Sequence, residues 1–170
     1  MSTITTEQIK ALRDATGISV MHCKKALEEA EGDMESAITI LRKKGGAAAL
    51  KKQDRTLGAG TIAAYVHAKG SVATLVEVQC ETDFVSSNSE FKALAHDIAM
   101  QIAATSPKYI DIDEVAEEDK SNGEISADVL LMQPFIKNPE ITVKEHIDTA
   151  VHKFGEKIRV ARMTRYSVLG

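Results

Sequence analysis

The spacing of apolar residues divides the chain into two parts. Up to residue 44, apolar positions recur every three or four residues, which predicts three short amphipathic helices. Thr5 and Gln8 have the spacing of a capping box, and Ser19 and Asp33 are suited to cap the second and third helices. Gly17 ends the first helix, because glycine adopts the left-handed conformation without strain. The helices are expected over residues 5–17, 19–30 and 33–44.

From residue 60 onward the apolar period changes to two, which is the period of a half-buried strand. Helical spacing returns twice, each time after a capping box. The expected elements, in order, are strands 61–67 and 71–80 around a turn at 68–70, a helix from the Ser87–Glu90 capping box to before Pro107, a short edge strand at 109–112, a helical turn over 127–133, a loop at 135–139, a helix from the Thr142–Glu145 capping box to Gly155, and a last strand over 157–169.

This order of elements predicts an α+β fold, with helices packed on an antiparallel sheet. Glycine pairs flank the segment between the two parts, which is typical of a linker, although the middle of the segment is rich in helix-forming residues. The expected organisation is a three-helix docking domain over residues 1–45, a linker over 46–59 and an α+β core domain over 60–170.

The segment that follows the second strand places apolar residues in polar surroundings. Thr82, Asp83, Phe84 and Val85 lie among Glu, Ser and Asn residues, and the composition predicts a loop. Two explanations are open for Phe84: it folds back and closes the end of the core, or it is presented to a partner with Asp83 as a polar effector beside it.

A second apolar pair lies off the buried stripe of its helix. At about 100° per residue, Cys23 and Leu27 share the core face of the second helix, whereas Met21 points almost the opposite way and Val20 lies at the edge. Val20 and Met21 are either a contact patch for a partner or residues that pack locally under the preceding loop.

Charge argues against general affinity for nucleic acid. The net charge is −4, and the acidic stretch 111–124 alone carries −6, so the remainder of the chain is +2. The acidic stretch is expected to be a solvated surface excursion. Arg159, Arg162 and Arg165 are spaced at three, which in a regular strand puts neighbouring arginines on alternating faces and disfavours a single RNA-binding stripe.

Motifs for catalysis, metal binding and cofactor binding are missing from the sequence. Cys23 and Cys80 lack zinc-site or disulfide spacing, which favours a reducing compartment. His22 and Cys23 are adjacent, but adjacent helix positions point about 100° apart and share no metal geometry. There is no phosphate loop, dinucleotide motif or nucleophile elbow. We expect a cytoplasmic protein that is not an enzyme, with no cofactor and no membrane segment.

Two stretches resemble the signatures of bacterial translation elongation factor Ts, in its short form with a single core subdomain. They cover residues 12–27 and 77–85, and the run 133–158 is also similar. The chain departs from the family pattern at three positions: His22 stands where Asp is usual, Val20 where Met is usual, and Gln79 where Asn is usual.

The resemblance implies a guanine-nucleotide exchange factor that binds elongation factor Tu in its GDP-bound and nucleotide-free forms. In that family the helical domain is similar to a ubiquitin-associated fold, and Leu12, Val20 and Met21 would dock on the partner. The segment 82–85 would form the exchange loop, in which Phe84 enters an apolar pocket and Asp83 helps to displace magnesium.

Two other classes remain open. A helical-domain adaptor would bind a protein partner without nucleotide exchange and would leave the Phe84 segment without a role. An RNA-binding protein would use the three arginines near the C-terminus, against the acidic balance of the chain. The single copy of the core subdomain also suggests that two chains pair as a homodimer.

Overall fold

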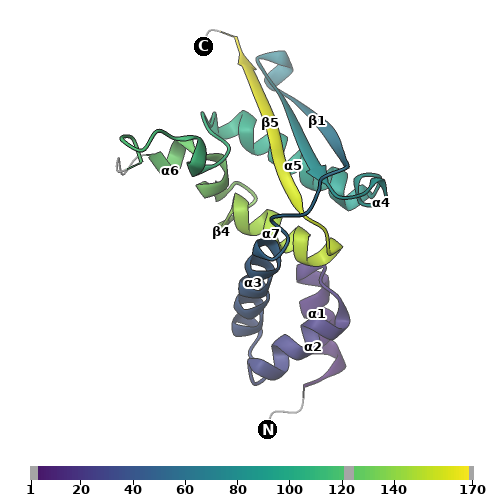
Figure 1. Cartoon of the computed structure of the whole chain (residues 1–170). Coiled ribbons are helices and arrows are strands. Elements are labelled where there is room, and N and C mark those ends of the chain that lie inside the picture. The colour runs from purple at the N-terminus through teal and green to yellow at the C-terminus, as the bar shows by residue number, and fades with distance from the viewer. Residues whose placement is uncertain (1–3, 121–124, 169–170) are drawn as a thin grey trace.

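The structure is a computed structural model that describes residues 4–120 and 125–168. Three helices at the N-terminal end form one part, and a three-stranded antiparallel sheet with its covering helices forms the other, so the expected α+β class is confirmed (Figure 1). Among the described residues no helix combines the length and the apolar character that crossing a membrane requires.

The caps predicted for the N-terminal helices are present. The Thr5–Gln8 capping box is complete, Gly17 has a positive φ of 67°, and the side chains of Ser19 and Asp33 accept backbone hydrogen bonds at the second and third helices. Leu12 and the stripe from Cys23 to Leu27 form a small core with Leu41. The three helices are α1 (Thr6–Thr16), α2 (Val20–Glu29) and α3 (Met34–Leu50).

The third helix does not end at residue 44 but continues through Gly45 and Gly46 to Leu50, so the first part of the expected linker is helical. Gly45 allows α3 to cross another helix at close distance. A Cβ on Gly45 would lie 3.1 Å from the carbonyl oxygen of Asp148, in helix α7 (Val143–Phe154) of the core. α3 therefore packs directly on the core, and the connecting segment begins after Leu50.

The sheet has the order β1–β2–β5, with antiparallel neighbours throughout. Helix α5 packs on one face, and its apolar stripe, including Phe91 and Ile98, forms the main core with Val76 and Val78 of β2. Ala68 and Lys69 adopt positive φ values in the turn between β1 and β2. The elements are β1 (Ala59–His67), β2 (Val72–Cys80), α5 (Ser89–Thr105) and β5 (Ile158–Ser167).

One predicted cap is correct and one is displaced. The Thr142–Glu145 capping box begins α7 as expected, and Gly155 ends it with a φ of 72°. Helix α5, by contrast, is capped by Asn88, whose side chain accepts the hydrogen bond from the backbone N–H of Glu90, so the expected Ser87 cap is wrong. Asn and Ser are equally suited to this role, and the position is decided by the turn that precedes the helix.

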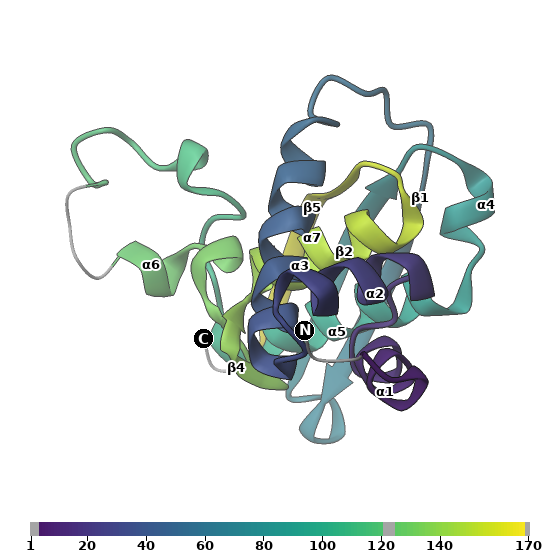
Figure 2. The ribbon, with the colours of Figure 1, turned by 90° about the horizontal axis from the view of Figure 1, so that it is seen from below.

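The segment between α5 and α7 forms an arm that projects from the core around α6 (Figure 2) and is anchored in the main core by buried Leu130 and Phe135. The edge strand expected at 109–112 is reduced to one bridge between Tyr109 and Val129, and the loop expected at 135–139 contains a small hairpin. Of the acidic stretch 111–124, residues 121–124 lie outside the described residues. The arm contains η2 (Ile112–Glu114), α6 (Ile125–Asp128), η3 (Leu130–Met132), β3 (Pro134–Phe135) and β4 (Asn138–Thr142).

A bulge in β5 overturns the expected alternation for Arg159 and Arg162, whereas Arg165 lies on the face covered by α5, where its side chain donates to the carbonyl oxygen of Ala103. The register shifts between Glu77 and Val78 of β2, and Ala161 is the extra residue on β5. Arg159 and Arg162 therefore lie on the same exposed face, where Arg162 pairs with Glu77 at 2.6 Å. A bulge cannot be read from a spacing of three residues, because the spacing assumes an uninterrupted pleat.

Candidate functional site

The segment that follows β2 is a short helix, α4 (Asp83–Ser86), and not the expected loop. The Phe84 side chain is 83% exposed, and Val85 beside it is buried in the main core. The explanation that an apolar residue closes the end of the core therefore applies to Val85. Phe84 is held in solvent by a helix that its neighbour anchors, which leaves the partner-facing explanation for Phe84.

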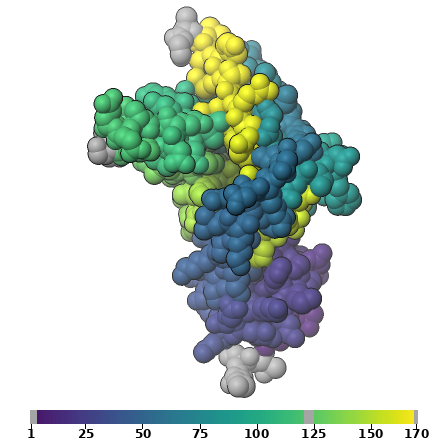
Figure 3. All heavy atoms as spheres, viewed as in Figure 1, coloured from purple at the N-terminus to yellow at the C-terminus, as the bar shows by residue number. Residues whose placement is uncertain are grey.

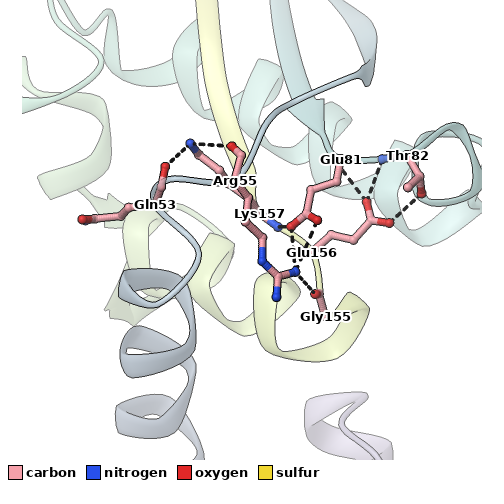
Figure 4. Close-up of polar contacts among 7 residues, drawn as sticks. All are labelled: Gln53, Arg55, Glu81, Thr82, Gly155, Glu156 and Lys157. Atoms are coloured by element: carbon pink, nitrogen blue, oxygen red, sulfur yellow. Dashed lines mark hydrogen bonds and ion pairs between the residues drawn. The ribbon is translucent and has the colours of Figure 1, made fainter.

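The start of α4 is fixed by a carboxylate from a distant part of the sequence. Glu156, in the connection from α7 to β5, accepts hydrogen bonds from the backbone N–H groups of Glu81 and Thr82, both at 3.1 Å. Its other oxygen accepts the Thr82 hydroxyl at 2.5 Å (Figure 4). Thr82 is the N-cap residue of α4; its hydroxyl makes no cap hydrogen bond to the helix, and its proton is donated to Glu156.

The contact is reciprocal. The Glu81 carboxylate accepts the backbone N–H of Lys157 at 2.6 Å and is paired with Arg55 at 3.2 Å. β2 and β5 separate at this point, and the two carboxylates satisfy backbone N–H groups that the strand ladder no longer pairs. We call this arrangement the carboxylate clasp: the side chains of Glu81 and Glu156 with the backbone of residues 81–82 and 157.

The clasp also holds the segment that connects α3 to β1. The Nζ of Lys157 donates to the backbone carbonyl oxygens of Gln53 and Arg55, and the Arg55 guanidinium also donates to Gly155 O (Figure 4). Segments about a hundred residues apart in the sequence are thus tied together directly behind α4.

The surroundings of Glu81 favour the charged form of its carboxyl group. Burial alone would raise the pKa of the Glu81 carboxyl, but the hydrogen bond from Lys157 and the adjacent Arg55 outweigh it, and the net effect lowers this pKa. Burial raises the pKa of the Cys80 thiol, whose sulfur donates to the carbonyl oxygen of Thr82 at 3.2 Å. Glu81 is therefore charged in its pair with Arg55, and the buried Cys80 thiol is neutral.

The docking residues expected on the helical domain separate into two kinds. Val20 is 53% exposed and Met21 is 66% exposed, so neither packs under the preceding loop. Leu12 is completely buried in the helical core, and the expectation that it contacts a partner is corrected. The signature that contains Leu12 combines core and surface positions, and periodicity places Leu12 among the core positions.

The three departures from the family pattern lie in different surroundings. His22 contacts the hydroxyl of Ser19 at 3.1 Å, and its ring lies 4.7 Å from that of His152 on α7, so it takes part in the contact between the helical domain and the core. Val20 is exposed beside Met21. Gln79 lies on the exposed face of the sheet, where it contacts Glu77 and Arg159.

The exposed apolar residues belong to elements on one side of the molecule. α2, which carries Val20 and Met21, lies in the lower part of Figure 1, and α4, which carries Phe84, lies higher up beside the sheet, both to the right of α3. Within residues 4–120 and 125–168, no group of three or more His, Cys, Asp or Glu side chains is arranged to hold a metal ion.

The sequence pattern did not reveal the members of the clasp. Glu81 lies inside a signature stretch, but its partner Lys157 is 76 residues away. The available signal was that one acidic residue directly follows β2 and another lies two residues before β5, and that the end of β2 pairs with the start of β5. That signal requires the strand pairing to be known.

Apolar side chains held in solvent on anchored elements are typical of surfaces that bind another protein, and this two-part α+β chain has the features of a protein-binding factor. The family model described as Elongation factor TS matches residues 3–126. The chain belongs to the elongation factor Ts family and is a translation elongation factor.

Curated relatives support this assignment over nearly the whole chain. Elongation factor Ts of Carboxydothermus hydrogenoformans is 43% identical, over 97% of this chain and 89% of its own length. The protein of the same name from Heliobacterium modesticaldum is 42% identical, over 97% and 90%. That of Thermotoga neapolitana is also 42% identical, over 97% of each chain.

Proposed function

We propose that this chain is a guanine-nucleotide exchange factor that binds elongation factor Tu and accelerates the release of GDP in the cytoplasm. The observation that carries the proposal is the 83% exposure of Phe84 on a helix that is anchored through buried Val85. An exposed aromatic residue without a partner has no stabilising role in the monomer, whereas on a fixed helix it is ready to enter a pocket of another protein.

The proposed mechanism divides the work between the two parts of the chain. Val20 and Met21 dock the helical domain on the partner, and Phe84 then enters an apolar pocket next to the nucleotide site. Asp83 helps to displace the magnesium ion that neutralises the nucleotide phosphates. Loss of that charge weakens GDP binding, because the ion is the largest positive charge near the phosphates.

Energetics require both parts. Full burial of one Phe contributes about 1.5–3 kcal/mol, which corresponds to roughly a ten- to hundredfold change in an equilibrium constant. Linkage makes the antagonism mutual, so GDP must weaken the binding of the factor as much as the factor weakens the binding of GDP. Phe84 therefore acts as the wedge, and docking contacts outside α4, chiefly those of the helical domain, supply most of the binding energy.

The test is the rate at which fluorescently labelled GDP leaves elongation factor Tu, with and without this chain and with excess unlabelled GDP present. Acceleration that saturates with chain concentration is expected. Binding without acceleration would favour the adaptor alternative, in which the helical domain binds a protein without nucleotide exchange. No binding and no acceleration would contradict both functions.

We also propose that two copies of the chain pair through the sheet. α5 covers one face of the sheet, and the opposite face exposes large apolar side chains of all three strands. Atoms of β5 reach the visible surface in Figure 3. An exposed apolar sheet face of this kind is typical of an interface. The residues are Ile62, Val66, Leu75 and Tyr166.

A further inference from the structure

The orientation of Phe84 depends on contacts that the side chains of Asp83 and Phe84 do not make themselves. α4 has only four residues, too few to be stable as an isolated helix, so its direction is set by its surroundings. Two contacts provide this: Val85 in the core at one end, and the carboxylate clasp on Glu81 and Thr82 at the other.

We infer that Glu81 and Glu156 are positioning residues of the exchange site, which hold α4 so that Phe84 meets the partner in one orientation. The inference rests on the proposed function. Glu156 accepts three hydrogen bonds from the residues that lead into α4. A charged acceptor with three donors is strongly directional, which suits a positioning role.

The clasp also contacts the segment that follows α3, next to the helical domain. Arg55 pairs with Glu81, and Lys157, whose backbone N–H donates to Glu81, holds the carbonyl oxygens of Gln53 and Arg55, so the connection that follows α3 is fixed to the Glu81 side of the clasp. The docking part and Phe84 are therefore held in a fixed relation by one network of contacts. Removal of Glu156 should free α4 without disturbing the docking surface on α2.

The first test needs no partner. The chain has no tryptophan, so Phe84→Trp introduces a single fluorescent probe at the exposed position. In this background Glu156→Ala is expected to increase the amplitude of fast local motion in the anisotropy decay. Glu140→Ala, which removes an exposed glutamate on β4, is the matched control and should leave the decay unchanged. An unchanged decay in Glu156→Ala would overturn the inference.

The second test separates rate from affinity. Glu156→Ala is expected to lower the maximal rate of GDP release about tenfold, in proportion to the loss of charge-assisted hydrogen bonds, with half-saturation little changed. Glu156→Gln should restore much of the rate, because an amide oxygen still accepts from both N–H groups and the amide NH₂ can donate to Thr82. A change in half-saturation alone would overturn the positioning role.

A double substitution tests whether Glu156 acts through Phe84. In the Phe84→Ala background, Glu156→Ala should cause no further loss of rate, because the side chain that it positions is absent. Losses that multiply would show that Glu156 acts elsewhere and would overturn the inference. Should Glu156→Ala unfold, Thr82→Val removes the 2.5 Å hydrogen bond from the other side and is expected to act in the same direction.

The two levels of the proposal fail differently. If the unmodified chain does not accelerate GDP release, the proposed function is wrong, while the anisotropy measurement still shows whether the clasp holds α4. If the chain accelerates release but Glu156→Ala is as fast as the Glu140→Ala control, only the positioning role is wrong.

Discussion

Neighbouring apolar residues of this chain differ in burial, because their side chains point in different directions from the same helix. Val85 is buried and Phe84 is exposed, although both are apolar and both belong to the same turn of α4. One turn of helix can anchor itself through one side chain and offer the next to a partner. The same division holds in the helical domain, where Met21 is exposed and Cys23 is buried.

The buried position of Leu12 leads to a prediction about stability. Leu12→Ala is expected to destabilise the helical domain by about 2–5 kcal/mol, because it opens a cavity in a small core. Leu50→Ala is the matched control, since Leu50 is a leucine that is mostly exposed, and such surface changes usually lie within about 0.5 kcal/mol. Chemical denaturation followed by circular dichroism measures both. Equal stability of the two variants would contradict the burial of Leu12.

At the scale of elements, the crossing of α3 and α7 joins the two parts of the chain. Gly45 lies where a side chain would meet the Asp148 backbone at 3.1 Å, whereas a Cβ on Gly46 would lie 3.7 Å from the Asp148 carboxylate, an ordinary contact distance. The close approach of α7 thus accounts for glycine at position 45, whereas position 46 has room for a side chain.

This difference predicts opposite effects of two substitutions. Gly46→Ala is expected to stabilise the chain by about 0.5–1 kcal/mol, because alanine is the better helix former and fits the available space. Gly45→Leu is expected to destabilise it by about 1–3 kcal/mol through overpacking against α7. Thermal unfolding of both variants is the measurement. A Gly45→Leu protein as stable as the parent would show that the helices do not cross closely.

α7 also carries a histidine that makes stability depend on pH. The ring of His146 stacks on Phe135, 4.2 Å between centroids, and burial lowers its pKa below the ordinary value of about 6.5; Asp97 opposes this shift and Lys137 adds to it. The unfolded chain therefore takes up the proton first as the pH falls. The contribution of neutral His146 is complete above about pH 6.5 and is lost progressively below it.

His146→Gln should therefore flatten the dependence of unfolding free energy on pH between about pH 7 and 5, even if it lowers stability at neutral pH. The parent chain, measured in the same series, gives the reference slope. Denaturant titrations at several pH values measure the slope. A slope unchanged in His146→Gln would contradict the assignment.

Local signals predicted the elements better than they predicted their contacts. The caps at Thr5, Ser19, Asp33 and Thr142 follow from residues within one helical turn, and each is present. The continuation of α3, the bulge at Ala161 and the carboxylate clasp each depend on a partner far away in the sequence. Such contacts are set by tertiary packing, which no periodicity contains.

The part of the candidate site that lies on a regular helix could be predicted in part from local sequence signals. Met21 lies off a regular stripe and Val20 at its edge, so spacing placed the pair outside the core. Spacing left open whether the pair packs under the preceding loop, and only the structure shows that both are exposed. For Phe84 the pattern left two explanations, because a four-residue helix gives no period to measure. Its exposure follows from the packing of Val85 and from Glu156, and both require the folded chain.

At the scale of the whole molecule, the exposed face of the sheet predicts self-association. Ile62→Asp places a charge among apolar side chains and is expected to convert a dimer to a monomer in sedimentation velocity. Leu50→Asp is the matched control, since Leu50 is exposed to a similar degree but lies on α3, away from the sheet face. A monomeric parent chain at micromolar concentration, or a dimeric Ile62→Asp variant, would contradict the pairing.

In the proposed mechanism the helical domain supplies affinity by docking on the partner, and Phe84 sets the rate by acting at the nucleotide site. The most direct test is the rate of GDP release from elongation factor Tu as a function of chain concentration, for the parent chain and two variants. Phe84→Ala should lower the plateau by roughly ten- to a hundredfold with little change in half-saturation, and Met21→Asp should raise half-saturation with the plateau preserved. A Phe84→Ala plateau equal to that of the parent chain would contradict the account.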